Sequence, residues 1–133
     1  MRVVGPDTLE IASTATHGGK PVIEVVHLAA FDGAETQHRF PDFTWFAMRA
    51  AETVIELLRR DANLCMAEEA PERRDTLGHR LVYLRLASGA DLASELLARG
   101  LGIAREGTWA RADDYRALEA RARLAAEGHW GEA

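Results

Sequence analysis

The stretch Val22-Ile23-Glu24-Val25-Val26-His27-Leu28 decides the fold, because a run this rich in β-branched residues predicts a strand. Just before it, His17-Gly18-Gly19-Lys20 predicts a tight hairpin, since glycine supplies the positive φ that such turns need. Residues 2–4 and 8–11 alternate polar and apolar side chains, as half-buried strands do. The first third of the chain is therefore predicted to form strands, two of them joined by this hairpin.

After a polar, irregular stretch at 32–41, the pattern changes to that of a helix over residues 42–60. Several apolar side chains recur at spacings that place them on one helix face. They are Trp45, Met48, Val54, Ile55 and Leu58. We expect this face to pack against the core rather than to bind a partner.

The second half of the chain is predicted to begin with two more strands, at 63–67 and 81–86. A short helix over 92–99 follows. Asp91 is placed to cap the start of this helix, and Gly100 is placed to end it.

A last helix is predicted over 113–127, with Gly128 ending it and with Glu119 and Arg123 spaced as an exposed ion pair. The order of elements is strands, helix, strands, helix, helix, without a repeat or a linker. This order predicts one α+β domain over residues 1–133, with a small closed barrel rather than a βαβ sheet.

The composition agrees with one globular domain of 133 residues, of which 47% are hydrophobic and 28% charged. The net charge of −5 argues against a protein that coats nucleic acid by bulk electrostatics. No apolar stretch approaches the ~20 residues needed to cross a bilayer. Residues 1–4 do not resemble a secretory signal, which predicts a cytoplasmic protein or a trimmed secreted one. Cys65, the single cysteine, is expected in the core.

Three carboxylates are the constellation that could carry chemistry. Asp7 precedes the strand at 8–11, while Asp32 and Glu35 follow the strand at 22–28. If these strands pair across the hairpin, their far ends bring Asp7 close to Asp32. Clustered oxygens suit a hard cation such as Ca²⁺ or Mg²⁺. The alternative is that each acid is a solvated turn residue.

Two histidines lie where they could act as acid, base or part-time cation. His27 falls inside the apolar strand, and His79 follows Gly78 just before the next strand. Histidine titrates near pH 6.5, so its charge changes in the physiological range. The alternative is that each is a hydrogen-bonded structural group.

The sequence resembles the staphylococcal nuclease-like (thermonuclease) family at five places, in order along nearly the whole chain. Val-His-Leu-Ala-Ala-Phe-Asp-Gly-Ala-Glu at 26–35 tracks V-R-L-x-G-I-D-A-P-E, and Gly-Pro-Asp-Thr-Leu at 5–9 stands where the family has D-G-D-T-hydrophobic. Residues 75–83 resemble D-x-Y-G-R-x-L-A-Y, and 95–102 resemble E-x-L-V-x-x-G-L-A. Residues 128–130 resemble the terminal G-x-W.

The resemblance implies a five-stranded OB-fold β-barrel with three helices and calcium-dependent phosphodiester hydrolysis. On this basis Asp7 and Asp32 are metal ligands for Ca²⁺, with Mg²⁺ or Mn²⁺ as alternatives. Glu35 orients or deprotonates the attacking water. The two catalytic arginines of the family fall on His27 and His79. Histidine offers one donor per nitrogen, whereas arginine grips phosphate through a planar, permanently charged fork.

The chain also departs from the family pattern near the substrate. Leu77 replaces a tyrosine, and the loop from Arg105 to Trp109 lacks the nucleotide-stacking tyrosines. Arg105 and Trp109 remain as candidates to contact nucleic acid or a nucleotide. Three hypotheses follow: a nuclease with an altered site, an OB-fold module that binds nucleic acid or nucleotide without cutting it, and a protein-interaction domain.

Overall fold

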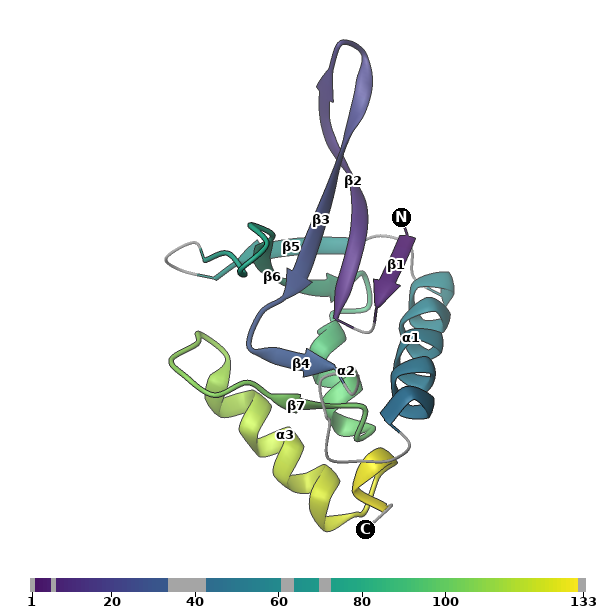
Figure 1. Ribbon diagram of the computed structural model, residues 1–133, viewed down its shortest axis with the longest axis vertical. Helices are drawn as coiled ribbons and strands as arrows, with labels where there is room; N and C mark the ends of the chain where they lie inside the picture. The colour runs from purple at the N-terminus through teal and green to yellow at the C-terminus, as the bar shows by residue number, and fades with distance from the viewer. Residues whose placement is uncertain (1, 6, 34–42, 61–63, 70–72, 132–133) are drawn as a thin grey trace.

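The strands of the computed structural model, which describes residues 2–5, 7–33, 43–60, 64–69 and 73–131, form two sheets (Figure 1). The larger is a mixed sheet of order β1-β2-β3-β6-β5, in which only β3 and β6 are parallel. The smaller pairs β4 with β7 in antiparallel fashion. The strands are β1 (Arg2–Gly5), β2 (Thr8–His17), β3 (Lys20–Leu28), β4 (Phe31–Gly33), β5 (Leu64–Glu68), β6 (Arg80–Leu86) and β7 (Gly102–Ala104).

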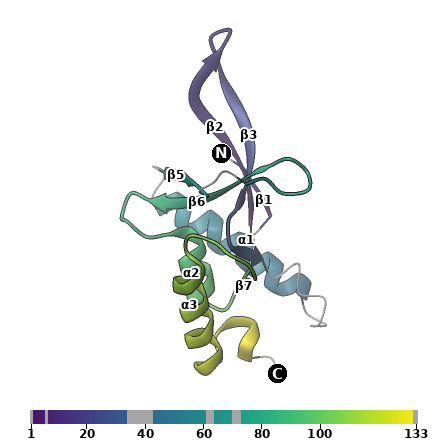
Figure 2. The same cartoon turned by 90° about the vertical axis from the view of Figure 1, so that its left-hand side faces the viewer.

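The predicted hairpin is confirmed, and it is longer than the sequence pattern indicated. His17 pairs with Lys20 across a two-residue turn in which Gly18 and Gly19 have φ values of 60° and 78°. Positive φ at both central positions gives a turn whose twist matches that of the flanking strands. The far end of the hairpin projects beyond the rest of the molecule (Figures 1 and 2).

Three α-helices occur in the described part of the chain, close to the predicted positions. They are α1 (Phe43–Arg60), α2 (Leu92–Ala98) and α3 (Ala112–Leu124), followed by a 3₁₀ turn at Gly128–Gly131. Helix α2 contacts β6, α1 and α3. The two sheets and three helices make an α+β architecture, as predicted.

The inner face of α1 differs from the predicted one. Val54 and Leu58 are buried as expected, and Ala50 completes that face. Met48 and Ile55 are 59% and 40% exposed, so the prediction that they belong to the core is wrong. Helical spacing alone does not separate two adjacent rows of apolar side chains on one helix. The elements that pack against the helix decide which row is buried.

Asp91 caps α2 as predicted, and its carboxylate also ties two helices together. Its Oδ2 accepts hydrogen bonds from the Ser94 backbone N–H at 2.9 Å and from the Tyr115 hydroxyl at 2.6 Å. Its Oδ1 lies 3.2 Å from the Arg111 guanidinium. These contacts join the start of α2 to α3 in the core, where Tyr115 is fully buried.

The five-stranded sheet is open among the described residues, with β1 and β5 at its edges. Closure into a barrel, and with it the OB-fold, stays a prediction. Cys65 lies on the edge strand β5 and is exposed, so its predicted core position is wrong. An edge strand contacts the sheet on one side only, which leaves its side chains open to solvent. None of the described helices combines the length and apolarity needed to cross a membrane.

Candidate functional site

The structure brings Asp7 and Asp32 together at the point where β2, β3 and β4 meet. Thr8, the first residue of β2, pairs with His27 near the end of β3, so the two strand ends lie side by side. The chain then turns into β4, and the backbone N–H of Gly33 donates to Asp7 Oδ2 at 2.9 Å. The hairpin therefore produces the convergence that the sequence suggested.

Asp7 is the buried member of the pair, with 2% of its surface exposed. Its Oδ1 accepts a hydrogen bond from Thr8 Oγ1 at 3.0 Å and lies 3.5 Å from His27 Nε2. The Thr8 hydroxyl and the Gly33 N–H thus donate to one carboxylate oxygen each, and the His27 ring lies beside Oδ1. A buried carboxylate held this way keeps a fixed orientation.

Asp32 is the more accessible member, with 25% of its side chain exposed. Its pKa is raised mainly by burial, and the nearby Asp7 adds to the increase, whereas Arg105 and His27 oppose it. Arg105 follows β7, the partner strand of β4, and its Nε lies 4.0 Å from Asp32 Oδ1. The Arg105 backbone N–H donates to the Ala30 carbonyl at 2.8 Å, which fixes this position.

His27 is oriented by its own strand. Its Nδ1 lies 2.9 Å from the carbonyl oxygen of Leu28, and because a carbonyl only accepts, Nδ1 carries the proton. A second proton therefore goes to Nε2, the atom that faces Asp7. When charged, His27 is positioned to neutralise Asp7.

His79 is oriented by Asp75, four residues earlier. Its Nδ1 lies 3.0 Å from Asp75 Oδ2, while the backbone N–H groups of His79 and Leu77 donate to Oδ1. Although burial opposes it, these hydrogen bonds and the His79 ring lower the pKa of Asp75. The carboxylate thus fixes the ring, and Nε2 is the atom that is left to meet a ligand.

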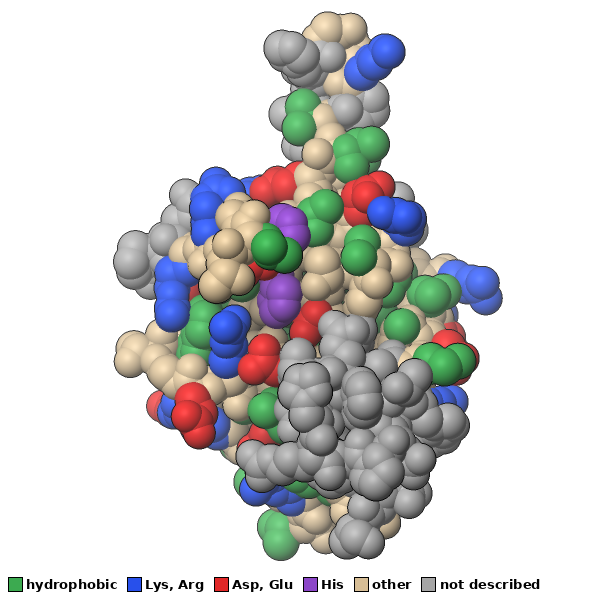
Figure 3. Space-filling view, in the orientation of Figure 1, with side chains coloured by type: hydrophobic (Ala, Val, Ile, Leu, Met, Phe, Trp, Pro, Cys, Tyr) green, Lys and Arg blue, Asp and Glu red, His purple; other side chains and the backbone are tan. Residues whose placement is uncertain are grey.

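His27 and His79 lie on one face of the sheet. His27 is opposite Leu81 in the parallel β3–β6 pair, and His79 precedes Leu81 by two residues, the period that returns a side chain to the same face. Arg80 points to the opposite face and pairs with Glu24. Figure 3 shows histidine side chains gathered on one face near acidic and basic groups.

Trp109 lies beside Arg105 but offers little surface for stacking. Only 7% of it is exposed, and its indole N–H donates to the Glu106 carbonyl at 3.0 Å. Arg73 Cζ lies 3.7 Å from the ring centroid, and Arg105 Cζ lies 5.7 Å from it. A base can stack on this ring only if Arg73 moves away, so the role of Trp109 stays a prediction.

Carboxylate oxygens of the kind provided by Asp7 and Asp32 suit a hard divalent cation. Among the residues that the structure describes, no group of three or more His, Cys, Asp or Glu side chains is arranged to hold a metal ion. Glu35, the third predicted acid, lies outside the described residues. Two carboxylates fit such a cation in charge and donor type, and they leave its other coordination positions to water or substrate.

Sequence reasoning missed the group that holds the loop carrying Arg105 and Trp109. Glu69 is buried, and it accepts hydrogen bonds from the Tyr83 hydroxyl and, at 2.8 Å, from the Ala110 backbone N–H. Burial and the Glu69 carboxylate raise the pKa of Tyr83. Glu69 stands in the charged stretch 68–75, whose composition and Pro71 indicate a loop, and no sequence signal indicates its burial.

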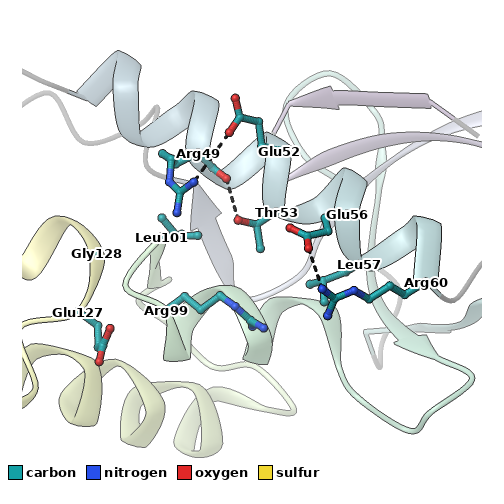
Figure 4. Close-up of a pocket in the computed structure, with 10 residues that line it drawn as sticks. All are labelled: Arg49, Glu52, Thr53, Glu56, Leu57, Arg60, Arg99, Leu101, Glu127 and Gly128. Atoms are coloured by element: carbon teal, nitrogen blue, oxygen red, sulfur yellow. Dashed lines mark hydrogen bonds and ion pairs between the residues drawn. The ribbon is translucent and has the colours of Figure 1, made fainter.

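Away from Asp7 and Asp32, a groove of about 510 Å³ lies between α1, the end of α2 and residues 127–128 (Figure 4). Its arginines pair with acids of their own helices: Arg60 lies 2.8 Å from Glu56, and Arg99 contacts Glu95. None of the predicted site residues lines it. Because its charges are matched locally, this groove offers no concentrated field to a ligand.

Comparison with known proteins gives no family for this chain. No protein-family model matches the chain, and no curated protein matches it.

Proposed function

We propose that the chain is a metal-dependent phosphodiesterase that cleaves nucleic acid, with the OB-fold of the staphylococcal nuclease-like family. The observation that carries the proposal is the meeting of Asp7, Asp32, His27 and Arg105 at the ends of β2, β3 and β7. Two carboxylates beside two cationic groups can bind both a metal and a phosphate. The five ordered motifs of the sequence give the same expectation independently.

In this proposal Asp32 and Asp7 hold the cation, which is Ca²⁺, or alternatively Mg²⁺ or Mn²⁺. When bound, the cation neutralises charge on the phosphoryl oxygens. The closeness of Asp7 to Asp32 supports this role: although burial is the main cause of the raised pKa of Asp32, the charge of Asp7 adds to it, and two close carboxylates favour a positive charge between them. Glu35 is assigned the activation of water from its motif alone.

His79, His27 and Arg105 are proposed to contact the phosphate. Arg105 supplies permanent charge, and its half-exposed guanidinium can pair with phosphate as a planar fork. His79 offers Nε2, because Asp75 holds its other ring nitrogen. Since protonated imidazole binds phosphate better than the neutral ring, we expect the rate to increase as the pH falls from about 8 to 6.

A second candidate function is a catalytically degenerate OB-fold module that binds nucleic acid, a nucleotide or a protein partner. The observation that favours it is the 3.5 Å separation of His27 Nε2 from Asp7 Oδ1. A positive charge on His27 at this position is neutralised by Asp7 and does not act on a bound phosphate. The phosphate then receives less stabilisation than two arginines would give, and each such donor is worth on the order of a hundredfold in rate.

Cleavage of labelled single-stranded DNA and RNA tests the proposal, with Ca²⁺, Mg²⁺ or Mn²⁺ present and the pH varied from about 5 to 9. We expect metal-dependent cleavage that Asp32→Ala lowers by on the order of a hundredfold. The matched control is Glu52→Ala, which removes an exposed acid on α1 and should leave the rate unchanged.

The proposal fails if the purified protein cleaves neither substrate faster than the Asp32→Ala variant with any of the three metals. Calorimetric titration with the same oligonucleotides then separates the two candidates. Binding without cleavage supports the module, and the absence of both rejects it as a nucleic-acid binder.

A further inference from the structure

A groove of about 580 Å³ begins at Asp32 and follows β7 and α3 away from the candidate site. Three arginines and three acids line it. They are Arg105, Arg116, Arg123, Asp32, Glu106 and Glu119. Because Asp32 belongs both to this groove and to the proposed metal pair, a chain molecule bound at the metal can continue directly into the groove.

The arginines of the groove are held in place and remain accessible. Arg116 donates to the Gly107 carbonyl at 2.9 Å, and Arg123 Cζ lies 4.2 Å from the centroid of the Trp130 ring. The side chains of Arg116 and Arg123 are 51% and 56% exposed. They are seven residues apart on α3, about 10.5 Å along the helix axis at 1.5 Å per residue.

The acids of the groove are not equivalent. Glu119 Oε1 accepts a hydrogen bond from the Ala104 backbone N–H at 3.0 Å, and Oε2 lies 3.5 Å from Arg123, so this carboxylate is used in holding β7 against α3. The predicted Glu119–Arg123 pair therefore exists, but its acid is only 17% exposed. Asp32 is the acid that a cation at the proposed site would neutralise.

The charge of the groove depends on that cation. Three guanidinium groups and three carboxylates cancel, which gives a polyanion no net attraction. A divalent cation held by Asp32 and Asp7 adds two positive charges, of which Asp7 offsets one, so the groove with its cation gains one net positive charge. Phosphate groups along a nucleic-acid strand then meet arginines at several points.

We propose that this groove binds the phosphates of single-stranded nucleic acid on one side of the phosphodiester held at Asp7 and Asp32, and that it does so only when the divalent cation is bound. The inference rests on the proposed function and extends it from one phosphodiester to a strand of several nucleotides. Coupling is reciprocal, so a strand that binds better with the cation also strengthens binding of the cation by the same factor.

Fluorescence anisotropy with labelled thymidine oligonucleotides of two and eight residues, with and without Ca²⁺, tests this inference. The test variant is Arg116→Gln with Arg123→Gln. We expect it to weaken binding of the eight-residue strand at least tenfold in Ca²⁺ and to change dinucleotide binding less than twofold. We also expect the salt dependence of binding to decrease by about 1.4 in the log–log slope, at ~0.7 for each lost phosphate contact.

The matched control is Arg59→Gln with Arg121→Gln, which removes the same charge from exposed arginines outside the groove. Circular dichroism of both double variants checks that they are folded. Equal binding of the long strand by the test variant and by the unchanged protein overturns the groove, whatever the cleavage assay gives. Tight binding without Ca²⁺ overturns the dependence on the cation.

The failure of the proposed function is distinguishable from these outcomes. In that case the protein cleaves no substrate above Asp32→Ala, although loss of Arg116 and Arg123 still weakens the long strand and supports the groove. If cleavage depends on Asp32 but the affinity for the eight-residue strand is unchanged when both arginines are replaced, the proposed function stands and this inference is rejected.

Discussion

At the scale of single residues, Asp32 is held where its charge costs stability. Burial raises its pKa, Arg105 opposes that increase, and Asp7 adds to it. The folded protein therefore keeps the Asp32 proton to a higher pH than the unfolded chain does. The stabilisation from that proton is fully present below the ordinary carboxyl pKa near 4 and is lost as the pH rises through the raised value.

Asp32→Asn should therefore increase the free energy of unfolding at pH 7 by about 1 kcal/mol, because the amide has no charge to desolvate. The difference in the free energy of unfolding should disappear near pH 3, where Asp32 is protonated in both the folded and the unfolded protein. Urea unfolding at the two pH values measures it, with the exposed Glu52→Gln as control. A variant that is less stable than the unchanged protein at pH 7 would contradict this reading of Asp32.

At the scale of elements, the pairing of β4 with β7 places Asp32 and Arg105 together. Gly33 pairs with Gly102, and a Cβ atom added to Gly102 would lie 2.3 Å from Phe31 Cζ and 2.7 Å from the Asp32 carbonyl oxygen. Phe31 is fully buried and cannot move aside. The glycine is therefore required by close approach of the two strands.

Gly102→Ala should destabilise the protein by about 2 kcal/mol, because it forces overpacking against Phe31. It should also weaken Ca²⁺ binding, because the added methyl group pushes β4, which carries Asp32, away from β7. Thermal unfolding with and without Ca²⁺ measures both effects, and Ile103→Val, at the neighbouring position of β7, is the control with a cost of about 1 kcal/mol or less. Unchanged stability in Gly102→Ala would show that β4 and β7 lie farther apart.

At the scale of the whole molecule, buried carboxylates join segments that are distant in sequence. Glu69 contacts Tyr83 on β6 and the Ala110 N–H before α3, and Asp91 contacts Arg111. The loop that carries Arg105 is thereby fastened to the large sheet and to α2. The position of Arg105 depends on this packing as well as on its own strand.

Glu69→Ala should lower the free energy of unfolding by about 2 kcal/mol, because it leaves the buried Tyr83 hydroxyl without its acceptor and the part-buried Ala110 N–H without its own. Glu69→Gln keeps an accepting oxygen and should cost less. Urea denaturation compares both with Glu106→Ala, which removes an exposed acid from the same loop. Equal stability of Glu69→Ala and Glu106→Ala would mean that the hydrogen bonds of Glu69 do not hold the loop in place.

Local patterns predicted what depends on neighbours in the chain. Gly18 and Gly19 predicted the hairpin, Asp91 predicted the cap of α2, and the β-branched run predicted β3. The two three-residue strands β4 and β7 were not predicted, because neither has enough residues to show a period. Their pairing joins segments about 70 residues apart, as Asp32 opposite Ile103 shows.

The same division holds for the candidate site. The sequence by itself predicted that Asp7 approaches Asp32, because a hairpin brings its two far ends together, whereas the turn into β4 fixes where Asp32 lies. Tertiary structure alone decided that Met48 and Cys65 face solvent, that Glu69 is buried, and that Arg105 reaches Asp32. Burial and charge pairing depend on which surfaces meet, and that is a property of the packed chain rather than of local spacing.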